Sequence, residues 1–157
     1  MAACVYVKTS VISELTSGPS RELVTAAHHQ LTLEWWSIAR RGFRVFISEI
    51  VVQAASLGDP DSARLRLAAI GQIPLFQVSE DARTLAKVLI ADLAIPANAA
   101  IDALHVAVAA DNGIDFLPTW NCKHIANAKT RTQIQRSLRS RGYDPPVLCT
   151  PEELMKP

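Results

Sequence analysis

The sequence is poor in cysteine and in net charge, and each shortage excludes a class of protein. The 157 residues include three cysteines, Cys4, Cys122 and Cys149, which are too few and too scattered for a disulfide framework or a thiolate metal site. We therefore expect a protein of the reducing cytoplasm. With 16 basic and 15 acidic residues, the formal net charge is +1, so the chain as a whole does not attract nucleic acid or an anionic membrane. Any such attraction must come from a local patch.

Long apolar runs, internal repeats and low-complexity segments are also missing. The first residues lead into the apolar residues 4–7 without a basic region or a long apolar stretch, so we expect neither a signal peptide nor a membrane span. Hydrophobic residues make up 49% of the chain and charged residues 20%, which is enough apolar material for a substantial core. The length predicts one globular domain over residues 1–157.

Short apolar runs alternate with helical patterns along the chain. Strands are predicted at residues 5–7, 43–47, 74–78, from 114 onward, and at 147–149. Helices are predicted before the breaker at 18–19 and over 20–41, 48–56, 60–70, 79–95, 101–113 and about 130–141. This alternation implies parallel pairing and right-handed crossovers. The predicted fold class is therefore α/β, a three-layer α/β/α sandwich with a central, mainly parallel sheet.

The stretch around which the chain is organised is the apolar segment 101–113 and the strand after it. Asp102 opens a helix with almost no polar interruption, and Gly113 stands where a left-handed cap is expected. A polar cluster, Thr119, Trp120 and Asn121, closes the strand. The two polar ends are expected on one edge of the sheet, where α/β folds place their chemistry.

These residues carry a resemblance to a known family. Residues 102–105, Asp-Ala-Leu-His, lie on the predicted buried helix, and residues 119–127 read Thr-Trp-Asn-Cys-Lys-His-Ile-Ala-Asn. Both segments resemble the C-terminal half of a PIN domain, in a subgroup similar to the VapC toxins of type II toxin–antitoxin systems. The likeness extends from residues 5–11 through 48–52 and 58–60 to 148–154. It implies the PIN-domain fold.

The resemblance also implies a metal-dependent endoribonuclease. PIN-type nucleases gather three or four acids at the carboxyl edge of the sheet to hold Mg²⁺ or Mn²⁺, since hard cations prefer oxygen ligands. Asp102 matches the third acid, and Asn121 matches the fourth, where asparagine looks like a feature of the subgroup. Lys8 stands in place of the first acid, and Gln53 and Ala54 in place of the second. Two of the family's acids are therefore missing.

We hypothesise that Lys8 occupies the former metal position and pairs with Asp102, because exchanging a carboxylate for an ammonium changes the local charge by two units. Metal binding at Asp102 is then expected to be weak or absent. Glu14 and Glu49 are the carboxylates near enough in sequence to compensate, although Glu49 also suits its own helix start. The remaining residues expected to line the site are Thr9, Ser10, Thr119 and His105.

Several of these residues also have structural interpretations. Asp102 suits a helix start whatever its function, and His105 is either a ligand or a hydrogen-bonded core residue. His28 and His29 are adjacent, so they point about 100° apart on a helix and do not form a zinc pair. Trp35 and Trp36 fit packing, or one of them fits a subunit contact.

Between residues 123 and 143 the chain contains basic residues and no acid. This local basic face fits an RNA backbone, an acidic partner segment such as an antitoxin tail, or the solvated side of a helix. The residues assigned to nucleic-acid binding are Lys123, Lys129, Arg131 and Arg136.

Together these patterns predict a VapC-like protein with impaired catalysis that keeps RNA or partner binding, as a homodimer without membrane contact. The alternative is an active Mg²⁺- or Mn²⁺-dependent endoribonuclease toxin that uses Asp102 and Asn121 with compensating carboxylates.

Overall fold

The computed structural model describes residues 2–18, 20–121, 125 and 127–155, and strands lie where the apolar runs predict them. The strands are β1 (Cys4–Tyr6), β2 (Arg44–Ser48), β3 (Leu75–Phe76), β4 (Phe116–Pro118) and β5 (Val147–Cys149). They form one five-stranded sheet in the order β3-β2-β1-β4-β5. The neighbouring strands pair in parallel; Val5, for example, lies beside both Val45 and Phe116. The predicted parallel sheet is confirmed.

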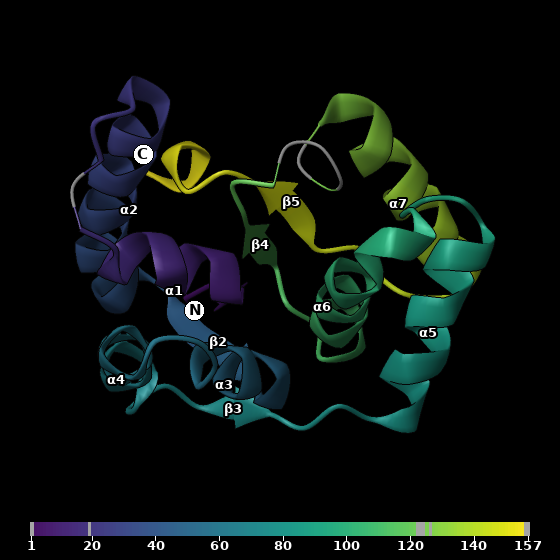
Figure 1. Ribbon diagram of the computed structural model, residues 1–157. Coiled ribbons are helices and arrows are strands. Elements are labelled where there is room, and N and C mark those ends of the chain that lie inside the picture. The colour runs from purple at the N-terminus through teal and green to yellow at the C-terminus, as the bar shows by residue number, and fades with distance from the viewer. Residues whose placement is uncertain (1, 19, 122–124, 126, 156–157) are drawn as a thin grey trace.

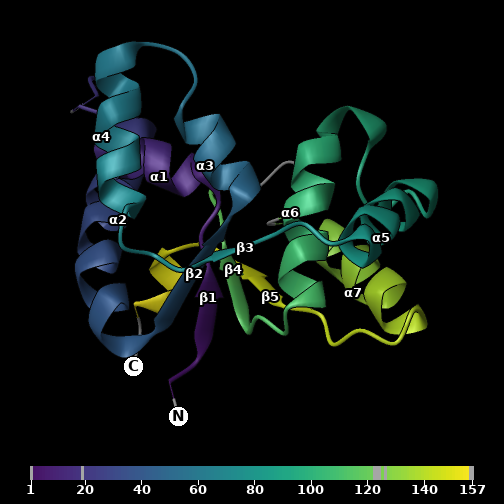
Figure 2. The same ribbon diagram turned by 90° about the horizontal axis from the view of Figure 1, so that it is seen from below.

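The helices cover the sheet in two groups, which Figures 1 and 2 show on opposite sides of the strands. The first group contains α1 (Thr9–Thr16), α2 (Leu23–Gly42), α3 (Glu49–Ala55) and α4 (Pro60–Ile70). The second contains α5 (Glu80–Ala91), α6 (Ala100–Asp111) and α7 (Ala128–Ser140). Two 3-10 turns, η1 (Ala97–Ala99) and η2 (Glu152–Leu154), complete the described elements. The fold is the predicted α/β/α sandwich.

The order of the strands reverses at β1. The chain winds outward from β1 through β2 to β3, and then returns to place β4 and β5 on the other side of β1. In open parallel sheets, ligands bind beyond the carboxyl ends of the strands at such a switch point. Lys8 follows β1 and Thr119 follows β4, so the polar residues singled out in the sequence lie at this point.

Helix α6 is buried from its second turn onward, which fits its lack of a polar face. Its residues from Ala103 to Ala110, apart from the half-buried Leu104, are buried, and the helix packs against α5. Gly113 has φ +65°, the left-handed conformation that glycine adopts without strain at a helix end. Asp102 remains near the surface at the first turn of α6.

Two elements differ from the prediction. The strand predicted at 74–78 shortens to two residues, because the Val78 N–H donates to Glu49 Oε1 at 2.7 Å and the segment leaves the sheet. Helix α2 is present, but several of the apolar residues that suggested it are solvent-exposed, with Leu23 84% exposed. Trp35 and Trp36 are both buried within the chain, so their packing interpretation is confirmed.

Among the described residues, no helix combines the length and the apolar character that crossing a membrane requires.

Candidate functional site

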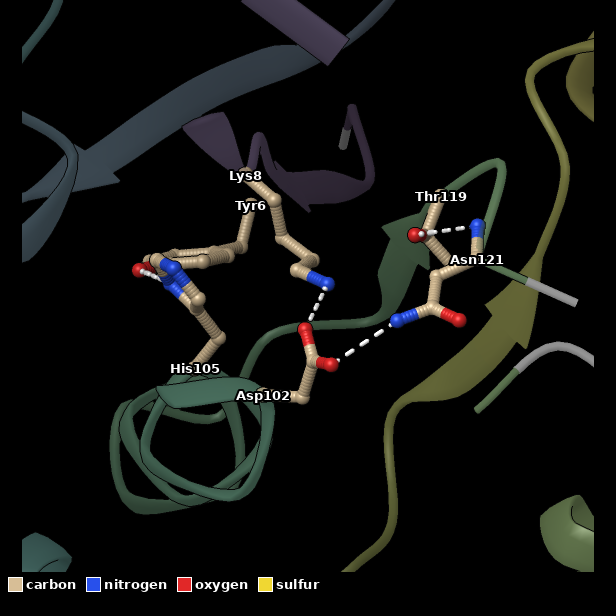
Figure 3. Close-up of polar contacts among 6 residues, drawn as sticks. All are labelled: Tyr6, Lys8, Asp102, His105, Thr119 and Asn121. Atoms are coloured by element: carbon tan, nitrogen blue, oxygen red, sulfur yellow. Dashed lines mark hydrogen bonds and ion pairs between the residues drawn. The ribbon is translucent and has the colours of Figure 1, made fainter. Parts of the chain in front are cut away.

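The candidate site forms where β1, β4 and the start of α6 meet (Figure 3). Lys8 is the N-cap residue of α1 and lies two residues after the end of β1. Asp102 lies in the first turn of α6, and Asn121 follows β4. Lys8 and Asp102 are 94 positions apart in the sequence and meet at the switch point of the sheet.

The centre of the site is an ion pair. Lys8 Nζ lies 2.5 Å from Asp102 Oδ1, so the contact predicted between these two residues is confirmed. The Lys8 side chain is 3% exposed and that of Asp102 is 19% exposed. Burial lowers the pKa of Lys8, while the charge and the hydrogen bond of Asp102 act in the opposite direction. The ammonium is thus desolvated, and Asp102 is the acid that compensates it.

The second oxygen of Asp102 is also engaged. Asn121 donates from Nδ2 to Asp102 Oδ2 at 2.8 Å, and its backbone N–H donates to Thr119 Oγ1 at 3.0 Å. Thr119 is fully buried at the end of β4, so it fixes the turn that carries Asn121. Both carboxylate oxygens of Asp102 therefore accept hydrogen bonds from side chains of this chain.

His105 lies one helical turn after Asp102 and belongs to a neutral hydrogen-bonded chain. Its Nδ1 is 2.6 Å from the Tyr6 hydroxyl, which is 2.7 Å from Ser48 Oγ. Burial, followed by the charge of Lys8, lowers the pKa of His105 to about 3, and burial raises the pKa of Tyr6. His105 is therefore neutral at pH 7, and its contacts are those of a hydrogen-bonded core residue.

Thr9 and Ser10 begin helix α1 beside Lys8. Thr9 Oγ1 is buried without a hydrogen-bond partner among the described residues, whereas Ser10 is exposed. Gln53 is exposed and Ala54 half-buried on α3. Among the described residues, neither of them forms a hydrogen bond with Lys8 or Asp102.

The two carboxylates considered as compensating ligands have other surroundings. Glu49 lies in the first turn of α3, and its Oε1 accepts the hydrogen bond from the Val78 N–H of another segment. Glu14 lies on α1, where its Oε1 is buried without a partner in the described part of the chain. Among the residues that the structure describes, neither carboxylate forms a hydrogen bond or an ion pair with Lys8 or Asp102.

Comparison with known proteins gives a structural likeness without a sequence match. No family model and no curated protein matches the chain. The crystal structure of VapC20 from Mycobacterium tuberculosis, a toxin that cleaves the sarcin–ricin loop, superposes with a TM-score of 0.53. It is 17% identical, and the likeness covers 76% of this chain and 91% of that one. The fold is PIN-like. At this identity the likeness establishes the fold alone.

PIN-like toxins depend on divalent metal ions, and the residues present here do not fit one. Within the described ranges, no group of three or more His, Cys, Asp or Glu side chains is placed to hold a metal ion. Among the described residues, Asp102 is the one carboxylate paired with Lys8, and both its oxygens already accept hydrogen bonds. A unit charge 4 Å from a buried ammonium interacts by roughly 4 kcal/mol at an effective dielectric of 20, so Lys8 repels a cation from this place.

The basic residues of α7 divide into two kinds. Lys129 and Arg136 are exposed. Arg131 instead donates to the Leu148 carbonyl at 3.1 Å and lies 3.9 Å from Glu153, so it ties α7 to β5 and η2 of the PIN-like fold. Lys123 lies outside the described residues.

One cluster beside the site was not predicted. The rings of His28 on α2 and Trp120 after β4 stack with centroids 4.0 Å apart, and Trp120 Nε1 donates to Thr32 Oγ1 at 2.8 Å. His29, the neighbour of His28, donates from Nδ1 to the Glu14 carbonyl at 2.8 Å. No pattern along the chain indicates these contacts, since the partners of Trp120 are more than eighty positions away and the histidines read as ordinary helix residues.

Proposed function

We propose that this chain is a single PIN-like domain, related to VapC toxins, in which metal-dependent RNA cleavage is impaired and binding of RNA or of a protein partner is retained. The observation that carries the proposal is the 2.5 Å contact between Lys8 Nζ and Asp102 Oδ1. The Lys8 ammonium held there supplies the positive charge that a metal ion would otherwise supply.

The chemistry of the site supports this proposal. Hydrolysis of an RNA phosphodiester in such folds needs a cation that binds several oxygens and activates water. Lys8 provides a fixed charge but no open coordination positions, and its burial leaves it paired with Asp102. The positions of the second acid hold Gln53 and Ala54, which supply no carboxylate. We therefore expect the site to keep its shape without its catalyst.

RNA is the ligand that we favour among the possible partners. VapC20 is a toxin that cleaves the sarcin–ricin loop, and the exposed Lys129 and Arg136 on α7 suit phosphate contacts. We propose an antitoxin-like protein segment as the other partner. We also propose that the chain is cytoplasmic and forms a homodimer. RNA affinity that falls with rising salt, and falls again when Lys129 and Arg136 are replaced by Met, supports the RNA proposal.

A nuclease assay with Mg²⁺ and Mn²⁺ tests the loss of catalysis. The wild type is compared with Lys8→Asp, with Lys8→Asp/Ala54→Glu and with Asp102→Asn on the same single-stranded RNA. Cleavage that is gained only in the two variants that restore acids supports the proposal. Cleavage by the wild type that is lost in Asp102→Asn contradicts it, and establishes the alternative, an active nuclease whose Glu14 or Glu49 compensates for the missing acids.

A further inference from the structure

Three consecutive residues after β4, Thr119, Trp120 and Asn121, are held by three different elements, and we call them the strap. The backbone N–H of Thr119 donates to the Cys149 carbonyl of β5 at 2.8 Å. Trp120 donates to α2, and Asn121 donates to Asp102 on α6 (Figure 3). Helices α2 and α6 belong to the two groups that lie on opposite sides of the sheet. The strap therefore links both groups at the carboxyl ends of the strands.

Helix α2 holds Trp120 through two contacts. The indole Nε1–H, which can only donate, donates to Thr32 Oγ1 at 2.8 Å. The single hydroxyl hydrogen of Thr32 is donated to the His28 carbonyl at 2.6 Å, so its oxygen is left to accept. The His28 ring stacks on the indole with centroids 4.0 Å apart and planes 10° from parallel. Because Thr32 is fully buried, water does not replace its hydroxyl as the acceptor.

The position of Asn121 depends on its neighbours in the strap. Its backbone N–H donates to Thr119 Oγ1 at 3.0 Å, and its Nδ2 donates to Asp102 Oδ2 at 2.8 Å. The Cα atoms of Trp120 and Asn121 are separated by about 3.8 Å across one trans peptide bond, so a shift of the indole is transmitted to the next residue. A hydrogen bond is lost once its atoms separate beyond about 3.5 Å. A displacement of about 1 Å at Trp120 is therefore enough to break the bond between Asn121 and Asp102.

That bond also fixes the carboxylate of the charged pair. Asp102 Oδ1 is held by Lys8 Nζ at 2.5 Å, and Oδ2 is held by Asn121. A carboxylate that loses its second donor is free to rotate, and Lys8, which is 3% exposed, then has a less well-placed partner. Contacts thus run without a gap from α2 through Trp120, Asn121 and Asp102 to Lys8.

We propose that Trp120 is a positioning residue that couples α2 to the charged pair. Docked on His28 and Thr32, its indole holds Asn121 against Asp102. A partner or ligand that moves α2 away from the strap loosens the pair, and a change at the pair alters the docking of Trp120 by the same free energy. This inference goes beyond the proposed function, because the coupling holds whether or not the site binds RNA.

The first test uses the full chain labelled with ¹⁵N, without RNA and without metal ions. The indole signal of Trp120 reports its docking, and the side-chain signals of Asn121 and Lys8 report the geometry of the charged pair. Thr32→Val removes the acceptor hydroxyl at nearly constant volume, and Thr32→Ser restores a hydroxyl. Thr132→Val on α7 is the matched control. Thr132 Oγ1 also donates to the carbonyl four residues before it, at 2.9 Å, and among the described residues it forms no hydrogen bond with the strap.

Thr32→Val should move the signals of Trp120, Asn121 and Lys8 together. Thr32→Ser should return them towards their wild-type positions, and Thr132→Val should leave them in place. His28→Ala removes the stacked ring from a half-buried position and places a good helix former on α2, so it should fold and move the same three signals. It keeps the test decisive if Thr32→Val does not fold.

The second test measures the coupling by a double-mutant cycle. Thr32→Val, Asn121→Ala and the variant with both substitutions are unfolded in urea. If the contact of Trp120 with α2 supports the contact of Asn121 with α6, the loss of one already weakens the other. The combined change in the unfolding constant should then fall short of the product of the single changes by about fivefold or more. In the control cycle of Thr132→Val with Asn121→Ala, the changes should multiply.

Two results overturn the inference. The first is a Trp120 signal that moves while those of Asn121 and Lys8 stay in place, in both Thr32→Val and His28→Ala. Asn121 then keeps its position without the docked indole. The second is a cycle between residues 32 and 121 in which the single changes multiply, which means that the two contacts are independent. Neither test uses RNA, so a failure of the proposed RNA binding leaves both results unchanged.

Discussion

Two polar connections join β1 to α6, and they use opposite chemistry. The first is charged and pairs Lys8 with Asp102 at 2.5 Å. The second is neutral and places the Tyr6 hydroxyl 2.6 Å from His105 Nδ1 and 2.7 Å from Ser48 Oγ. Residues 6 and 8 are two apart in an extended segment, and residues 102 and 105 are one turn apart on a helix. Each pair therefore shares a face, which aligns both connections between the same two elements.

The two connections differ in burial and in charge. The neutral connection is fully buried and each of its groups has a partner, so it stabilises the core. The charged connection reaches the surface at Asp102, and the cost of desolvating its charges offsets most of their attraction. In the folded chain the positive charge of Lys8 is balanced by the negative charge of Asp102.

The largest expected effect comes from breaking the charged connection on one side. Lys8→Met leaves the Asp102 carboxylate without its partner, and removal of one member of a buried pair costs about 3–5 kcal/mol. Because Asp102 is 19% exposed, we expect the lower end, about 3 kcal/mol. Denaturant unfolding measures the change. Lys8→Met/Asp102→Asn should recover most of the loss, and equal losses in the two variants would show that Asp102 is not held by the pair.

A smaller effect is expected from the neutral connection. Tyr6→Phe keeps the buried ring but removes the hydroxyl that contacts both His105 and Ser48. Leaving buried partners unsatisfied should lower the free energy of unfolding by about 2 kcal/mol. Tyr143→Phe, at the other tyrosine of the chain, is the control and should change stability little. If Tyr6→Phe matched that control, the neutral connection would contribute less than its geometry indicates.

The sequence predicted the charged connection and not the neutral one. Asp102 and Lys8 belong to motifs, and an ammonium in the place of an acid calls for a carboxylate nearby. Tyr6, by contrast, reads as one apolar residue of a strand, and its partner His105 lies 99 positions away. A hydrogen bond between two distant residues leaves no periodic signal, so it appears only when the elements are assembled.

Helices show the same division. The apolar run of α6 predicted burial on all sides, and Gly113 with φ +65° ends it as expected. In α2 the apolar residues predicted the helix but not its buried face. The rings of Trp35 and Trp36 fill the contact with the rest of the core, so Leu33 and Ile38 are left exposed. The spacing of apolar residues along a helix does not specify how wide a face of the helix the rest of the protein covers.

The two connections also differ in how the free energy of unfolding depends on pH. The pKa of His105 is lowered to about 3 in the folded chain, below its unfolded value of about 6.5, so between these values the unfolded state binds a proton that the folded state does not. The contribution of His105 to the free energy of unfolding is fully present above pH 6.5 and is lost as pH falls, by about 1.4 kcal/mol per pH unit for one proton.

Urea unfolding from pH 7 to pH 4.5 measures this slope. In His105→Gln, which keeps a polar side chain that does not titrate, the slope should flatten by that amount. An unchanged slope would mean that other groups dominate acid unfolding, and that the neutral connection is not kept neutral by its burial.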